Sequence, residues 1–138
     1  MRRKKSERMK LIEETESMIF QILKYKRGER CELCGGNKCL GLFHVLPKGA
    51  YPRLRLEKKN LLIAGWYCCH LPWHSSFYVA RDQILPKVKE ILGKDFEDRL
   101  RDLDNSLPPL DIVQIQTINK KVKRELRALE REWVHGGE

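Results

Sequence analysis

The pair Cys31-x-x-Cys34, followed at once by two glycines, constrains the fold of this chain more than any other feature. Two thiols held two residues apart by a tight turn can direct both sulfurs at one ion, as in a tetrahedral zinc site. The vicinal cysteines Cys68 and Cys69 follow later in the chain. The sequence therefore predicts a small region stabilised by structural Zn²⁺, because a region of this size is not stable on apolar burial alone.

The second half of this zinc site departs from the usual Cys-x-x-Cys spacing, because Trp66 stands three residues before Cys69. Either Cys68 or Cys39 must then supply the fourth sulfur, or the site is incomplete. Vicinal cysteines reach one ion only with unusual backbone geometry. Cys39 lies in an apolar stretch, and we expect it to belong to the core and not to the site.

Length and charge define the class of protein. The chain has 138 residues and a formal net charge of +9, which suits one domain and a polyanionic partner. A merely soluble basic protein is the alternative. The basic start at residues 1–5 resembles that of a signal peptide, but Glu13, Glu14 and Glu16 interrupt any apolar stretch. No apolar run is long enough to span a bilayer. Five cysteines disfavour complete disulfide pairing, so we expect a cytoplasmic protein with metal-binding thiols.

The pattern divides the chain into three regions. Residues 1–28 are predicted as an N-terminal helix, 29–80 as a zinc-containing core, and 81–138 as a helical region that packs on the core or forms a dimer. Ser6 is the expected N-cap of the first helix, which runs to about residue 27. Its apolar stripe consists of Leu11, Thr15, Met18, Ile22 and Tyr25.

Within the core, the sequence predicts two short strands and a helix. The first strand ends near His44, an irregular loop with prolines and glycine follows, and the second strand includes residues 61–63. A helix after Cys69 carries His74, and Pro72 is tolerated there because it falls in the first turn.

The last region predicts helices over residues 82–92 and on to about 103, a proline-containing linker, and a long final helix. Asp111 and Gln114 have the spacing of a capping box at its start. One side of this helix is apolar: Ile115, Ile118, Val122, Leu126, Leu129 and Trp133. The opposite side is mainly basic: Lys120, Lys121, Lys123, Arg124, Arg127 and Arg131.

Histidines of the core suit phosphodiester hydrolysis, which needs an activated water and stabilisation of charge on phosphorus. His44, at the end of a predicted strand, is the candidate base, because imidazole titrates near neutral pH. Asn60 could hydrogen-bond the loop after His44 and hold its ring in orientation. His70 and His74, four residues apart on one helix face, could bind a catalytic Mg²⁺ or Mn²⁺. A core histidine is the alternative for His44.

Basic residues crowd the loop after His44 and are candidates for contacts with DNA phosphates. They are Lys48, Arg53, Arg55, Lys58 and Lys59. A solvated charged loop is the alternative, and Arg55 could instead form a structural ion pair.

The order Cys-x-x-Cys, His44, Asn60 and Cys-His-x-x-x-His resembles the His-Asn-His (HNH) nucleases, whose fold is a treble-clef ββα-metal finger. The segment from Lys48 to Leu56 is similar to that of the phage Rap/NinG recombination nucleases, which also have a helical C-terminal tail. The resemblance is carried by residues 31–74. It implies a metal-dependent endonuclease for branched recombination intermediates such as Holliday junctions or D-loops, with His44 as base.

Two other functions stay open. HNH enzymes often carry a metal ligand directly before the base, and this chain has Phe43 there. That departure and the irregular second cysteine pair favour a non-catalytic zinc module that binds DNA or protein. A sequence-recognising HNH nuclease of homing, restriction or packaging type is a further alternative, although no base-reading element is evident.

The complete prediction is an α+β protein, mostly helical, with a small zinc-stapled finger between N- and C-terminal helices. The two apolar stripes could also support a homodimer, since symmetrical cutting of a junction needs two active sites. Packing of the same two helices within one chain explains the stripes equally well.

Overall fold

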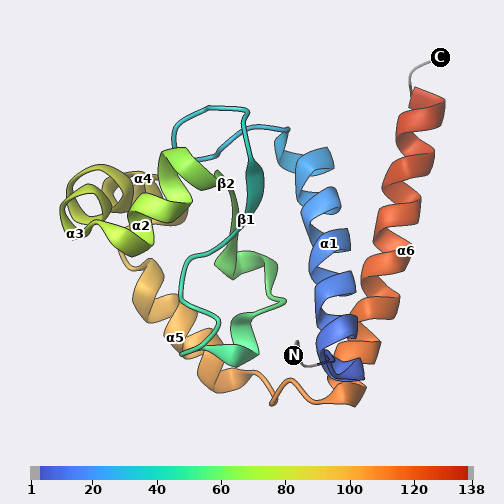
Figure 1. Cartoon of the computed structure of the whole chain (residues 1–138). Helices are drawn as coiled ribbons and strands as arrows, with labels where there is room; N and C mark the ends of the chain where they lie inside the picture. The colour runs from blue at the N-terminus through green and yellow to red at the C-terminus, as the bar shows by residue number, and fades with distance from the viewer. Residues whose placement is uncertain (1–3, 137–138) are drawn as a thin grey trace.

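The computed structural model describes residues 4–136, so the two chain ends named in the predictions above lie partly outside it. Figure 1 shows two short strands at the centre, with helices on both sides. The elements are α1 (Glu7–Arg27), β1 (Leu40–His44), β2 (Leu61–Gly65), α2 (Leu71–Ser75), α3 (Phe77–Val79), α4 (Leu85–Leu92), α5 (Phe96–Ser106) and α6 (Ile112–Gly136). The predicted α+β class with a mostly helical chain is confirmed.

The first helix begins and ends where its sequence indicates. The Ser6 hydroxyl accepts a hydrogen bond from the Met9 backbone N–H, which satisfies one of the free donors of the first turn. At the other end Gly28 has a φ of +91°, a conformation that glycine adopts without strain. Residues Ile12, Ile19 and Leu23 are fully buried, so the apolar face of α1 is broader than the predicted stripe.

Strands β1 and β2 form an antiparallel pair in which Leu42 lies opposite Ile63. Side chains alternate between the two faces of a strand, and both faces of β2 are buried. Leu62 and Ala64 pack on one side, whereas Leu61 and Ile63 pack on the other. The sheet therefore separates two apolar clusters.

The first cluster, called here the cysteine side, joins Cys31 and Cys69 to Phe43 of β1 and to α4 and α5. The second cluster, called the helical side, joins β2 to α1 and α6. Figure 1 shows α1 between the strands and α6. Only the two-stranded sheet lies between the two clusters, and each cluster packs on one face of β2.

Helices α1 and α6 run parallel and in contact. The Asn119 amide donates to the Thr15 hydroxyl at 2.8 Å inside this interface, and that hydroxyl donates to the Leu11 carbonyl. The Tyr25 and Trp133 rings lie 5.7 Å apart near its far end. The two stripes thus pack against each other within one chain. They no longer argue for the homodimer, which stays a prediction.

Helix α6 begins as predicted, with the Asp111 carboxylate accepting from the Gln114 backbone N–H at 2.8 Å. In the part of the chain that the structure describes, none of the helices has the length and apolar character needed to cross a bilayer.

Candidate metal centre and candidate active site

Four cysteines converge on one point. The sulfurs of Cys31, Cys34, Cys68 and Cys69 all lie within 4.8 Å of one another, and those of Cys34 and Cys68 are 3.3 Å apart. A regular zinc tetrahedron with Zn–S bonds of about 2.3 Å has S–S edges of about 3.8 Å. The four thiols are therefore close enough to bind a metal such as zinc.

The first pair is held by a tight turn. The Gly35 N–H donates to the Cys31 carbonyl, and the Cys31 N–H donates to the Gly36 carbonyl. The turn also docks on the free edge of β2, since the Glu32 N–H donates to the Ile63 carbonyl and the Glu32 carboxylate accepts from the Ile63 N–H. These hydrogen bonds hold the turn with Cys31 and Cys34 against the free edge of β2.

The second pair owes its position to a π-helical turn at Trp66–His70, which supplies the unusual backbone that vicinal ligands need. Gly65 precedes this turn, and a Cβ there would lie 2.6 Å from the Cys68 sulfur. Only glycine fits at this position without a shift of the site, a requirement that the sequence analysis missed. The Cys68-Cys69 dipeptide next to a glycine was the available signal.

Cys39 lies outside this cluster and is exposed. The expectation that it belongs to the core is therefore wrong. Its backbone has a φ of +52°, and its carbonyl accepts a hydrogen bond from the Trp66 N–H. Cys39 therefore forms the turn directly before β1. Cys68, not Cys39, is the fourth thiol of the site.

The crowding of thiols has an electrostatic consequence. Burial and hydrogen bonding with the Cys34 thiol raise the pKa of Cys68 to about 11. Burial also raises the pKa of Cys69. At Cys31, burial is outweighed by backbone N–H donors of Gly65, Leu33 and Cys34, which lower the pKa of its thiol. A bound cation favours the thiolate form at all four positions.

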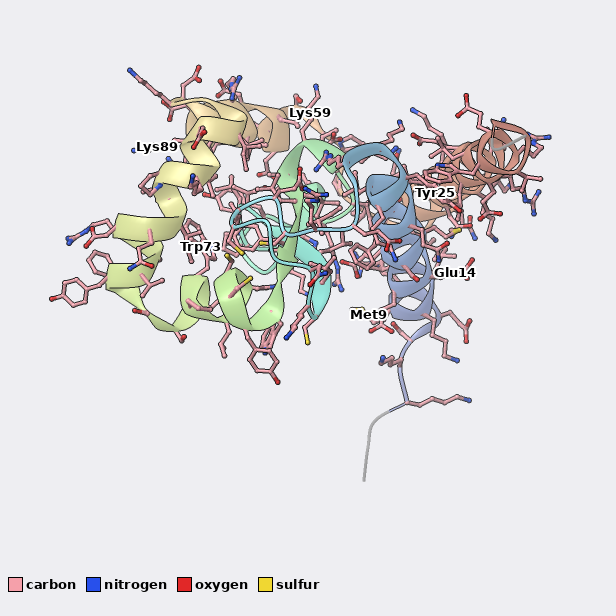
Figure 2. All side chains as sticks on the ribbon, turned by 90° about the horizontal axis from the view of Figure 1, so that it is seen from above. Met9, Glu14, Tyr25, Lys59, Trp73 and Lys89 are labelled. Atoms are coloured by element: carbon pink, nitrogen blue, oxygen red, sulfur yellow. The ribbon has the colours of Figure 1, made fainter. Side chains whose placement is uncertain are left out.

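A cleft of about 470 Å³ opens between α1, the loop after β1 and α2. Three of its lining residues are His44, His70 and His74. Lys48 of the loop and Glu13 and Glu16 of α1 also line it. In Figure 2 the α2 region, near the label of Trp73, and α1 lie on opposite sides of the strands.

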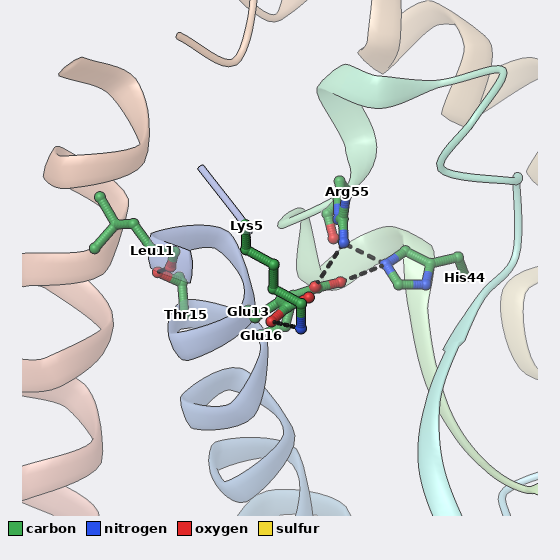
Figure 3. A network of polar contacts seen from close by, with 7 residues as sticks. All are labelled: Lys5, Leu11, Glu13, Thr15, Glu16, His44 and Arg55. Carbon is green, nitrogen blue, oxygen red and sulfur yellow. Dashed lines mark hydrogen bonds and ion pairs between the residues drawn. The ribbon is translucent and has the colours of Figure 1, made fainter. Parts of the chain in front are cut away.

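His44 is held by two acceptors at the same ring nitrogen. Its Nε2 lies 3.1 Å from the Arg55 carbonyl oxygen and 3.3 Å from the Glu16 carboxylate (Figure 3). Because both partners only accept hydrogen bonds, the ring proton of neutral His44 sits on Nε2, and Nδ1 keeps its lone pair. The side chain is 11% exposed.

Glu16 was missed by the sequence analysis, because it belongs to a helix remote from His44 in sequence. Its carboxylate also accepts from the Arg55 guanidinium at 3.0 Å. Burial alone would raise the pKa of this carboxyl, but the contacts to His44 and Arg55 outweigh burial and lower it. Glu16 is therefore ionised at neutral pH.

Asn60 is fully buried and makes the contact that the sequence predicts. Its side-chain oxygen accepts from the Leu46 N–H at 2.8 Å, and its amide donates to the Leu46 carbonyl at 3.0 Å. The Asn60 carbonyl accepts from the Val45 N–H. The segment directly after His44 is thus pinned to the start of β2.

His70 and His74 lie side by side, with ring centroids 5.1 Å apart. Burial, with the nearby His74, lowers the pKa of His70, which favours its neutral, ligating form. Within residues 4–134, the cysteine cluster is the only group of three or more metal-ligating side chains close enough to hold an ion. The two histidines therefore offer at most a two-ligand site. Phe43 is buried against His70 and Trp73 and does not line the cleft.

The five predicted DNA-binding residues do not share one environment. Lys48 is exposed in the cleft. Arg55 forms the ion pair with Glu16 that the sequence left as an alternative. Lys58 pairs with Glu125 of α6, and Arg53 donates to the Leu107 carbonyl at 3.0 Å. Lys59 is exposed but does not line the cleft.

No family model, curated protein or solved structure matches this chain.

Proposed function

We propose that this protein is a metal-dependent DNA endonuclease of the His-Asn-His class, built on a treble-clef ββα-metal finger. The cysteine turn, the β1–β2 hairpin and the helical segment that starts at the second cysteine pair follow one another in the order of that finger. The observation that carries the proposal is His44 itself. It lies at the end of β1 in a cleft, with Nε2 hydrogen-bonded and the following segment pinned by Asn60.

In this mechanism His44 is the general base. Hydrogen bonds from Nε2 to the Arg55 carbonyl and the Glu16 carboxylate hold the ring and leave the Nδ1 lone pair to take a proton from the attacking water. The ionised Glu16 then stabilises the imidazolium that forms, because it lies 3.3 Å from the protonated ring. Asn60 positions this arrangement without touching the substrate.

The metals have separate roles. Structural Zn²⁺ would be held by Cys31, Cys34, Cys68 and Cys69, which fit it in number and spacing. His70 and His74 would bind the catalytic ion, Mg²⁺ or Mn²⁺, which supplies Lewis-acid stabilisation of the phosphate and the leaving oxygen when bound. Lys48 in the same cleft would contact a phosphate.

The proposed substrate is branched DNA such as a Holliday junction or D-loop, which the enzyme would cut during recombination. The enzymes that the chain resembles are phage-borne. The resemblance of the segment from Lys48 to Leu56 and the net charge of +9 support this choice. A cytoplasmic location and a homodimer belong to the same proposal.

A non-catalytic zinc module is the second candidate. Two observations favour it: Phe43 is buried where related enzymes often carry a metal ligand, and the cleft holds two adjacent histidines without a third ligand close by in the described residues. Such a module would bind DNA or a protein partner and cut nothing. A sequence-recognising HNH nuclease of the homing, restriction or packaging type would cut linear DNA at defined positions.

The test compares the wild-type protein with His44→Gln and His44→Ala on labelled four-way-junction, nicked and linear DNA, in Mg²⁺ or Mn²⁺. The wild type should cut the junction. Both variants should lose cleavage by a factor of 10² or more, while DNA affinity stays within about twofold, because a base is lost and not a contact.

His44→Gln serves as the matched variant, since its amide can still donate to the Arg55 carbonyl. Equal cleavage by His44→Ala and wild type would remove the proposed active site. Binding without any cleavage by the wild type would favour the non-catalytic module, and cleavage of linear DNA at fixed positions would favour a sequence-recognising enzyme.

A further inference from the structure

The outer face of α6 carries a row of basic side chains that the proposed active site does not use. This basic stripe consists of Lys120, Arg124, Arg127 and Arg131. The spacings of four, three and four residues place all four on one face of a helix with 3.6 residues per turn. All four are exposed, and within residues 4–134 none has an ion-pair or hydrogen-bond partner.

Glu130 and Glu132 are exposed beside Arg131 in the sequence, but within residues 4–134 no acidic residue forms an ion pair with the stripe. Glu125 lies on the flank of the helix and pairs with Lys26 of α1 and Lys58. Lys123, on the other flank, pairs with Glu14 of α1. These contacts balance charge along the α1–α6 seam and leave the outward face positive.

The buried face of α6 limits what the stripe can bind. Ile115, Val122 and Leu126 pack into the helical side of the core. An amphipathic helix that lies in a membrane surface must insert its apolar face, and here that face is occupied. Four positive side chains in a row fit the evenly spaced phosphates of a nucleic-acid backbone, and the exposed Val113 and Val134 stand only at the two ends of this row. We therefore take a polyanionic strand, and not a lipid surface, as the occupant.

The position of the stripe relative to the cleft is informative. Glu13, Glu16, Ser17 and Phe20 of α1 line the cleft, whereas Leu11, Thr15 and Met18 of α1 face α6 or its core cluster. Figures 1 and 2 both show α1 between the strands and α6. The stripe points away from α1, so one straight duplex in the cleft cannot also lie along it.

We propose that the basic stripe of α6 binds the phosphate backbone of a second duplex arm while the first arm occupies the cleft. This deepens the proposed function, on which the role of the first arm rests. From Lys120 to Arg131 the helix rises by about 16 Å, and a duplex carries one phosphate charge per about 1.7 Å of axis. The stripe thus meets several phosphates at once. It makes branched DNA a better ligand than linear DNA, because only branched DNA offers two arms in different directions.

The experiment measures binding to a labelled four-way junction and to a linear duplex of the same length, without added divalent ions, at several salt concentrations. The stripe variant combines Lys120→Ala, Arg124→Ala, Arg127→Ala and Arg131→Ala. Alanine favours the helical conformation, and the four replaced side chains form no ion pair or hydrogen bond within residues 4–134, so α6 should stay folded. Its unfolding temperature is the check.

The matched control removes four positive charges elsewhere, with Lys38→Ala, Lys87→Ala, Lys89→Ala and Lys94→Ala. All four lysines are exposed, and they lie on the cysteine side of the molecule or on its loops. Both variants therefore have the same net charge, and only the position of the lost charge differs.

The stripe variant should lose most of its preference for the junction over the linear duplex. For the junction, the slope of log K against log salt should fall by roughly 3 to 4, as expected for four phosphate contacts at about 0.9 each. The control should keep the preference. Equal changes in both variants, an unchanged slope, or binding to phosphatidylserine vesicles but not to DNA would overturn the proposal.

Failure here is distinguishable from failure of the nuclease. Binding is measured without cleavage, so loss of junction preference in the stripe variant supports the stripe even if the wild type never cuts. Conversely, cleavage that depends on His44 together with a stripe variant that binds like the control would retain the nuclease and remove the stripe.

Discussion

The two sides of the central sheet are stabilised by different means. On the helical side, the 21 residues of α1 and the 25 of α6 cover β2 with large aliphatic side chains. On the cysteine side, the elements are short, two of the buried residues are the thiols Cys31 and Cys69, and the four sulfurs converge. Long helices bury enough apolar surface to hold together, whereas short elements need a cross-link. The four thiols that could hold a metal therefore belong to one half of the molecule.

The candidate active site lies where these two halves meet. His44 comes from the hairpin and Asn60 precedes β2, but Glu16 belongs to α1 of the helical side. The geometry of the cleft therefore depends on both sides of the molecule, so a change to either side should alter it.

Loss of zinc should have the largest effect and is the most direct test of whether the two sides are stabilised independently. Cys34→Ser removes one of four thiols, and structural zinc contributes roughly 10–16 kcal/mol of binding free energy in small zinc domains. Elemental analysis should show about one zinc per wild-type chain and much less in the variant. The indole N–H NMR signals of Trp66 and Trp73 should move to unfolded positions, while that of Trp133 in α6 moves least.

Cys39→Ser is the matched control for this experiment, because Cys39 is exposed and outside the cluster. It should retain zinc and all three indole signals. Simultaneous loss of the Trp133 signal in Cys34→Ser would show that the two sides fold as one unit and that the distinction drawn here is wrong.

Truncation on the helical side should have an intermediate effect. Ile22 is fully buried between α1, α6 and β2, so Ile22→Ala should lower the free energy of unfolding by about 2–5 kcal/mol through lost burial and the cavity that remains. Zinc content should not change. Denaturant unfolding with zinc analysis checks both. Val113→Ala, at a site 62% exposed on α6, should change stability by less than about 0.5 kcal/mol. A zinc deficit in Ile22→Ala would contradict the separation of the two sides.

Removal of the contact that Glu16 of α1 makes with His44 and Arg55 should have the smallest effect on stability, and this effect should depend on pH. Contacts to His44 and Arg55 outweigh burial and lower the pKa of Glu16 below its ordinary value of 4.5. The resulting stabilisation is complete above that ordinary value and is lost as pH falls through the lowered pKa. The stability difference between wild type and Glu16→Gln should therefore shrink as the pH falls below about 4.5.

Glu13→Gln, one turn earlier on α1, is the control for Glu16. Its carboxylate pairs with Lys5 near the surface and does not contact His44. Its stability difference from wild type should be smaller at neutral pH. If Glu16→Gln matched it at every pH, the Glu16–His44–Arg55 contacts would contribute nothing measurable.

Local features were predictable because they depend on neighbours in sequence. Ser6 and Asp111 cap their helices as their residue type indicates, and Gly28 ends α1. Both strands fall where predicted, because short apolar segments stand next to turn residues. Asn60 also pins the segment after His44 as expected, since the hairpin brings the two ends of its loop together.

What failed involves residues without a local signal. The apolar setting of Cys39 predicted a core position, but the hairpin places it at an exposed, positive-φ residue. For Arg55 the sequence left a phosphate contact and a structural ion pair open, and it could not name Glu16 as the partner that the structure shows. In both cases a partner far away in sequence decided the outcome.

The sequence by itself determined the helices and their caps, the hairpin, the turn that presents Cys31 and Cys34, and the types of residue available for chemistry. These follow from short-range hydrogen bonds and side-chain periodicity. Only the tertiary structure decided that Cys68 joins Cys69, that Glu16 meets His44, and that the two apolar stripes pack on each other. Those choices rest on contacts between distant segments, because the three-dimensional path of the chain, and not the identity of neighbouring residues, sets which groups come within bonding distance.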